Sequence, residues 1–226
     1  MDLAERHVVI TGAAGGLGPA VVEAMMAAGA VCHVPVRDDA DRLPRHARIL
    51  AVEGVDLADE AAVMRFYAHC PPLWASIHLA GGFKAALIAD TSLADLRGQL
   101  DVNLATAFLC SREAVRNMRV KAAGGRIVNV SSRAATVATG FSVAYTASKA
   151  AVSAMVRALA DEVAEERILV NAVLPGTIDT PANRAAMPMA DHRKWTTPAE
   201  IAATIAWLVS PAQTVTSGAL IPVGWT

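Results

Sequence analysis

Short apolar runs alternate with longer segments of helical periodicity through almost the whole chain. Each run is continuous in apolar side chains, which is typical of strands covered on both faces. The predicted strands span residues 7–11, 31–36, 49–52, 74–79, 126–130, 168–173 and 220–223. The predicted helices span residues 17–28, 59–69, 93–119, 144–165 and 198–208. This alternation predicts an α/β fold: a doubly wound parallel sheet of about seven strands with helices on both faces.

The length of the chain favours a single domain over residues 1–226, because 226 residues are too few for two large α/β domains. Apolar residues make up 54% of the chain, which is enough for a substantial core. The last predicted helix has a clear start, with Thr197 as cap, Pro198 in the first position and Glu200 completing a capping box. The least regular stretch is residues 177–196.

The composition argues against several classes of partner. The net charge of −1 (20 basic against 21 acidic residues) disfavours nucleic acid and anionic membranes as main partners. We expect no membrane span, since no uninterrupted apolar segment reaches about 18 residues, and no secretory signal at the N-terminus. The cysteines Cys32, Cys70 and Cys110 form neither a metal-binding spacing nor a disulfide framework. We therefore expect a cytoplasmic protein without a metal site.

A glycine-rich turn lies between the first predicted strand and the first predicted helix. Gly12, Gly16 and Gly18 have the spacing G-x-x-x-G-x-G, and the commoner fingerprint is G-x-G-x-x-G. Glycine lets the backbone turn tightly and approach a pyrophosphate, and the helix N-terminus adds free N–H groups. Such a turn alone is equally compatible with a purely structural role. The strand before it and the helix after it favour a dinucleotide site.

The residue after the second predicted strand bears on the cofactor. An acidic residue there accepts hydrogen bonds from the 2′-hydroxyl of NAD, whereas arginine accommodates the 2′-phosphate of NADP. Arg37 follows Val36 directly and favours NADP. Asp38 and Asp39 come next and oppose a phosphate, so NAD stays the alternative. A solvent-exposed loop charge is the other interpretation of Arg37.

Tyr145 and Lys149 are four residues apart and share one face of a predicted helix. A tyrosine loses its proton only near pH 10, and a nearby ammonium lowers that pKa. Tyr145 could then exchange a proton with a carbonyl oxygen while hydride moves at the carbon. Ser132 follows a predicted strand and could hydrogen-bond the same oxygen. A Tyr-x-x-x-Lys pair alone is often only a helix-surface pair, and Ser132 upstream makes the chemical interpretation stronger.

Together these motifs resemble the short-chain dehydrogenase/reductase family, and the resemblance covers nearly the whole chain. It implies a Rossmann-like domain for cofactor binding and catalysis. It also implies a catalytic set of Asn103, Ser132, Tyr145 and Lys149, in which Asn103 bends its helix and holds a water linking Lys149 to solvent. The cofactor contacts implied, with Arg37 from the argument above, are Gly12, Ala14, Gly16, Leu17, Gly18, Arg37, Asp56, Leu57, Ala80, Gly81, Tyr145, Lys149, Pro175, Gly176, Thr177, Ile178 and Thr180.

The chain departs from the family pattern in three places. His78 stands where the family usually has asparagine, and we interpret it as a hydrogen-bonded core residue. The region after Thr180 is short, and residues 221–226 lack the usual acidic-glycine-glycine ending. These regions determine which substrate shapes the site accepts. An apolar pocket wall is expected from Phe141, Met187, Met189 and Trp195. An anionic group could meet Lys84, Arg133, Arg184 or Arg193, although exposed charge is the better explanation of each of these cations.

The sequence therefore predicts an oxidoreductase that moves a hydride between a nicotinamide cofactor and a small carbonyl or alcohol substrate. A non-catalytic dinucleotide sensor of the same fold is the alternative, but it predicts a broken catalytic set. A nucleotide-sugar epimerase would need a C-terminal domain larger than the residues after Thr180 supply. The resemblance also implies a homo-oligomer, a tetramer or dimer, paired through the helices at residues 93–119 and 144–165.

Overall fold

The computed structural model describes residues 1–38, 40, 43–137 and 140–224. Asp39 and the last two positions of the C-terminal ending therefore lie outside the described residues. Seven parallel strands form one sheet in the order β3-β2-β1-β4-β5-β6-β7. They are β1 (His7–Thr11), β2 (Val31–Pro35), β3 (Ile49–Val52), β4 (Ala75–His78), β5 (Gly125–Val130), β6 (Ile168–Pro175) and β7 (Leu220–Val223). The predicted doubly wound parallel sheet is confirmed.

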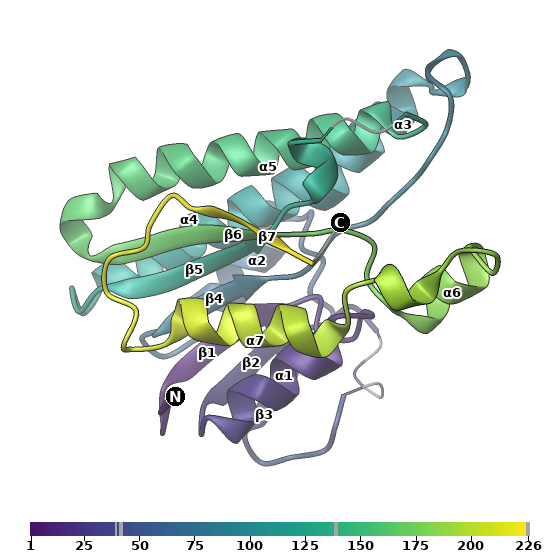
Figure 1. The fold of residues 1–226 in the computed structure, drawn as a ribbon. Helices are drawn as coiled ribbons and strands as arrows, with labels where there is room; N and C mark the ends of the chain where they lie inside the picture. The colour runs from purple at the N-terminus through teal and green to yellow at the C-terminus, as the bar shows by residue number, and fades with distance from the viewer. Residues whose placement is uncertain (39, 41–42, 138–139, 225–226) are drawn as a thin grey trace.

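Helices cover both faces of this sheet (Figure 1). On one face lie α1 (Gly18–Ala27) and α7 (Pro198–Val209), which pack against each other. On the other lie α2 (Glu60–Ala68), α4 (Thr106–Arg119) and α5 (Val143–Glu162). The predicted capping box of α7 is present, with Thr197 and Glu200 bonding reciprocally. Since β1 and β4 are neighbours, the strand order reverses between them and opens a crevice at their carboxyl ends.

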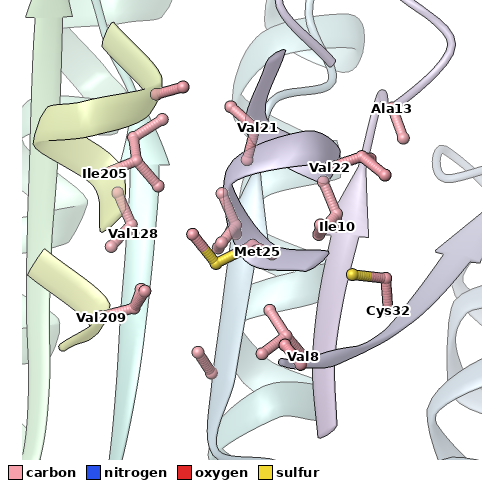
Figure 2. Packing of buried hydrophobic residues seen from close by; sticks show 14 of the residues in the cluster. Val8, Ile10, Ala13, Val21, Val22, Met25, Cys32, Val128, Ile205 and Val209 are labelled. Carbon is pink, nitrogen blue, oxygen red and sulfur yellow. The ribbon is translucent and has the colours of Figure 1, made fainter. Parts of the chain in front are cut away.

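The core consists of two apolar clusters, one on each side of the sheet. Side chains of a strand alternate between its faces, so Val8 and Ile10 of β1 join one cluster and Val9 joins the other. In the first cluster Met25 of α1 and Ile205 of α7 pack over the sheet, as Figure 2 shows. This explains why the central strands are continuously apolar in sequence: both of their faces are buried, whereas β3 at the edge of the sheet is largely exposed.

Two predicted segments differ from the structure. The single helix expected over residues 93–119 is α3 (Leu93–Leu100), a π-helical turn (Asp101–Ala105) and α4, because the N–H of Thr106 bonds the oxygen of Asp101. The stretch 177–196, expected to be irregular, contains the short helix α6 (Pro181–Ala186). The side chain of Thr180 caps α6 by accepting from the N–H of Asn183. Six residues are too few to show helical periodicity.

Among the described residues, no helix combines the length and the apolar character needed to cross a bilayer. Nor does any group of three or more His, Cys, Asp or Glu side chains within them lie close enough together to bind a metal ion. The three cysteines carry free thiols, and burial raises the pKa of each to about 12.

Candidate active site

A cavity of about 1090 Å³ opens at the carboxyl ends of the central strands. Its lining comes from the turn after β1, the segments after β2, β4, β5 and β6, and the start of α5. This is the crevice where the strand order reverses, the usual ligand position in doubly wound sheets. Of the residues predicted for catalysis and cofactor binding, all line the cavity except Gly18 and Asn103.

The glycine turn lets the main chain approach neighbouring segments closely. Gly12 has a φ of 68°, and a Cβ there would lie 2.6 Å from the main-chain nitrogen of Ala80. A Cβ on Gly16 would lie 2.9 Å from the Cγ2 of Thr180, across the mouth of the cavity. Helix α1 begins directly after the turn, and no side chain bonds its first N–H groups. This end of the cavity therefore fits the phosphate of a dinucleotide.

Gly18 has a different place from the one predicted. It does not line the cavity, and a Cβ there would collide with the main-chain oxygen of Ala13. Glycine at this position lets the first turn of α1 pack against the preceding loop. The structure shows a packing role for Gly18, and a cofactor contact at this residue stays a prediction.

The segments after β2 and β3 form one end of the cavity, where Arg37, Asp56 and Leu57 lie. Arg37 and Asp56 are exposed. The Oδ1 atom of Asp56 accepts a hydrogen bond of 3.0 Å from the N–H of Ala58, which orients its carboxylate. Asp38 does not line the cavity, so of the neighbours Arg37 and Asp38 only Arg37 faces it.

Ser132, Tyr145 and Lys149 meet in the cavity beyond the end of β5. Ser132 lies close enough to the hydroxyl of Tyr145 to lower the pKa of that tyrosine. Nζ of Lys149 donates a hydrogen bond of 2.9 Å to the carbonyl oxygen of Val130 and lies 6.0 Å from the ring centre of Tyr145. Ser132 and Lys149 are both buried. The structure thus assembles a hydroxyl pair beside a buried ammonium.

The pKa of Tyr145 differs from the expected one. Burial raises it above its ordinary value, and the hydrogen bond from Ser132 offsets only part of this effect. Lys149 does not contribute to this shift, because its ammonium donates to the oxygen of Val130. A lowering of the tyrosine pKa by Lys149 stays a prediction. Burial also lowers the pKa of Lys149 to about 8, since no carboxylate compensates its charge.

Asn103 lies behind the cavity in the π-helical turn and is buried. Its Oδ1 accepts from the N–H of Gly82 at 3.1 Å, and its Nδ2 donates to the oxygen of Gly82 at 2.9 Å and to the Oγ of Ser148 at 3.1 Å. Asn103 thereby ties the loop after β4 to α5. A Cβ on Gly81 would lie 2.7 Å from Oδ1 of Asn103 and 3.2 Å from Nζ of Lys149. Glycine at this position therefore lets the loop pass between these two side chains.

The segment after β6 faces the glycine turn. Pro175, Gly176, Thr177, Ile178 and Thr180 all line the cavity. Thr180 is buried because its hydroxyl caps α6 while its methyl group lies over Gly16. The segment thus closes the cavity on the side opposite β4.

His78 is a buried member of a polar network at the end of β4. Its Nδ1 bonds the Oδ1 of Asn129 at 3.1 Å, and its Nε2 bonds the Oγ of Ser76 at 2.8 Å. An amide oxygen only accepts, so Nδ1 carries the proton and Nε2 accepts from the serine. Burial lowers the pKa of His78 to about 4. The interpretation of His78 as a hydrogen-bonded core residue agrees with these contacts.

Only two of the four residues predicted for the apolar pocket wall line the cavity. Phe141 and Met187 line the cavity, whereas Met189 and Trp195 do not. Phe83 was missed by the sequence reasoning, although it follows Gly81 and Gly82 directly. Its ring packs edge-on against that of Tyr145, with centroids 4.8 Å apart and planes at 84°. The only signal for it was its position just beyond a strand end.

A family model described as short chain dehydrogenase matches residues 6–191 of this chain. The chain belongs to the short-chain dehydrogenase family. Cis-4-hydroxycyclohexanecarboxylate dehydrogenase of Sinomonas cyclohexanicum is 33% identical over 242 residues, covering 97% of this chain and 95% of that protein. Galactitol 2-dehydrogenase of Rhizobium johnstonii is 33% identical over 244 residues, covering 96% of this chain and 93% of that protein.

Among solved structures, an oxidoreductase of the short chain dehydrogenase/reductase family from Burkholderia thailandensis superposes with a TM-score of 0.87 at 31% identity. The match covers 97% of this chain and 91% of that one. This short-chain dehydrogenase is thus an oxidoreductase of alcohol and ketone groups that uses a nicotinamide cofactor, NAD or NADP.

Proposed function

We propose that this short-chain dehydrogenase uses Tyr145 as general acid and base, with Ser132, Lys149 and Asn103 in supporting roles, and prefers NADP. The observation that carries the proposal is the convergence of Ser132 and Tyr145 inside the cavity, with the buried ammonium of Lys149 beside them. These groups converge from β5 and α5 at one end of a cavity whose other end fits a dinucleotide phosphate.

The bound nicotinamide ring supplies the hydride in reduction and accepts it in oxidation. Tyr145 gives its phenolic proton to the carbonyl oxygen in reduction and takes a proton from the alcohol in the reverse direction. Burial of Tyr145 favours the protonated phenol, which is the form that donates in reduction. Ser132 hydrogen-bonds the same oxygen and orients it toward Tyr145. Lys149 would hold the hydroxyl groups of the nicotinamide ribose with its buried ammonium.

Asn103 acts through other residues and is a positioning residue. Its amide holds both main-chain polar groups of Gly82 and bonds Ser148, the residue before Lys149. This keeps Gly81 against the Lys149 side chain. The water-mediated link to solvent that the family resemblance implies would use the same side chain.

The preference for NADP rests on Arg37. Its side chain faces the cavity from the end of β2, and Val36 before it offers no carboxylate for the 2′-hydroxyl of NAD. Guanidinium groups bind phosphate bidentately, and such charge-assisted bonds are stronger than neutral ones. Asp38 does not line the cavity, which reduces the repulsion that would favour NAD.

The remaining proposals concern assembly and location. Residues 1–226 form a single domain, and the chain pairs with copies of itself through α4 and α5, where the large apolar side chain of Phe108 is half exposed. A cytoplasmic location agrees with the three free thiols, and cell fractionation tests it. Neither nucleic acid nor a membrane is a partner in this proposal; the partner is a small carbonyl or alcohol substrate.

The test compares the two tyrosines of the chain, Tyr67 and Tyr145. Tyr145→Phe should bind reduced cofactor almost normally, measured by its fluorescence, and lose roughly a hundredfold or more in turnover, measured by cofactor absorbance. Tyr67→Phe is the matched control, since its hydroxyl bonds Ser76 away from the cavity. Near-normal turnover by Tyr145→Phe would remove that residue from the mechanism. A wild-type protein that binds cofactor but turns over no ketone or alcohol would favour the sensor alternative.

A further inference from the structure

Large apolar side chains line the cavity near Tyr145. Phe83, Val137, Phe141 and Met187 belong to its wall, and they are exposed by 66%, 58%, 67% and 40%. Burying such side chains is favourable in proportion to the apolar area removed from water. These residues thus form a surface that gains free energy when an apolar molecule covers it.

Phe83 holds a defined position beside the reacting groups. It follows Gly81 and Gly82, which Asn103 fixes from behind through hydrogen bonds to Gly82. Its ring meets the ring of Tyr145 edge-on, 4.8 Å between centroids. A substrate whose oxygen lies at the Tyr145 hydroxyl therefore has its carbon body near Phe83.

Phe141 adopts a backbone conformation that is costly for a bulky residue. Its φ is 62°, in the left-handed region that favours glycine. The conformation is held by a hydrogen bond of 2.8 Å from the N–H of Ala86 to the oxygen of Phe141, and Ala86 and Ser142 form an isolated bridge. This bridge joins the loop of Phe83 to the loop of Phe141. Strain of this kind is retained mainly where it positions a functional side chain.

The cations considered for anion binding are largely compensated. Lys84 pairs with Asp95, Arg184 pairs with Asp179 through two bonds of 2.5 and 2.7 Å, and Arg193 pairs with Asp191. Arg133 lines the cavity and has no ion pair within the described part of the chain. Near Tyr145 the cavity is therefore lined by more apolar side chains than cations without an ion pair.

We propose that Phe83 and Phe141 determine specificity by holding an apolar substrate body, so that the natural substrate is an uncharged hydrocarbon-ring alcohol or ketone. The inference rests on the proposed function of Tyr145. A ring binds between two aromatic walls with little loss of its own conformational freedom. A polyol would lose hydrogen bonds to water at each hydroxyl that these walls cover, which disfavours it.

The test measures kcat/KM for cyclohexanol and for a six-carbon polyol with the preferred cofactor. The wild type should prefer cyclohexanol. Phe83→Ala and Phe141→Ala should each lower this preference about tenfold, because they reduce kcat/KM for cyclohexanol more than kcat/KM for the polyol. Phe83→Leu and Phe141→Leu should recover most of the loss because they restore apolar area. Met189→Ala is the control, because this side chain is 95% exposed and does not line the cavity.

Three outcomes would overturn the inference. One is a wild-type preference for the polyol, and another is an equal loss for both substrates in the alanine variants. The third is a preference for a carboxylate-bearing cyclohexanol that disappears in Arg133→Gln, which would assign the site to anionic substrates. Each of these requires turnover that depends on Tyr145, so failure of the proposed function remains distinguishable: the wild type would then turn over none of the alcohols.

Discussion

Acid should destabilise this protein through His78, and His78→Asn should remove that effect. The imidazole is buried and has a pKa of about 4, against its ordinary value of 6.5. Its Nδ1 bonds the amide oxygen of Asn129, and its Nε2 bonds Ser76 and, at 3.4 Å, the hydroxyl of Tyr67. Protonation of Nε2 would lose the bond from the serine hydroxyl and bury a charge without a carboxylate partner.

The sign and size of this effect on stability follow from the pKa of His78 in the unfolded chain and in the folded protein. The unfolded chain takes up a proton near pH 6.5 and the folded protein only near pH 4, so stability is complete above pH 6.5 and falls as the pH is lowered toward 4. The full difference corresponds to about 3 kcal/mol. Between pH 7.5 and pH 5, the loss due to His78 is about 2 kcal/mol.

Urea unfolding of wild type and His78→Asn at pH 7.5 and pH 5 measures this contribution. Other groups titrate in the same range, including His33, whose pKa burial also lowers to about 4, but they are common to both proteins and cancel in the comparison. Wild type should lose about 2 kcal/mol more than the variant. Equal losses in the two proteins would show that His78 accepts a proton in the folded state as readily as in the unfolded chain.

Two further predictions concern the cofactor and the assembly. Arg37→Ala should weaken NADPH binding roughly tenfold to a hundredfold and leave NADH binding unchanged, because one charge-assisted contact contributes about 1.5–3 kcal/mol. Calorimetric titration of both cofactors measures this difference. Equal affinities of the wild type for the two cofactors would contradict the preference for NADP. Light scattering should show a dimer or tetramer, held together through α4 and α5, and a monomer in dilute solution would refute this pairing.

The arrangement of strands and helices could be predicted because a doubly wound sheet leaves a strong local pattern. Strands buried on both faces, such as β1, are continuously apolar, and Thr197 with Glu200 marks the start of α7. The π-helical turn at Asn103 leaves no such pattern. It depends on hydrogen bonds from Asn103 to Gly82 and Ser148, whose elements are far apart in the chain.

The sequence by itself predicted which residues would carry the chemistry, and it placed them at one edge of the sheet. Gly12 and Ser132 follow predicted strands, and Tyr145 and Lys149 share one face of a predicted helix. Only the tertiary structure decided how these groups are tuned. The direction of the Lys149 ammonium, the raised pKa of Tyr145 and the edge contact of Phe83 all depend on segments that approach one another through folding. Burial and distance between such segments set a pKa, and no local spacing encodes them.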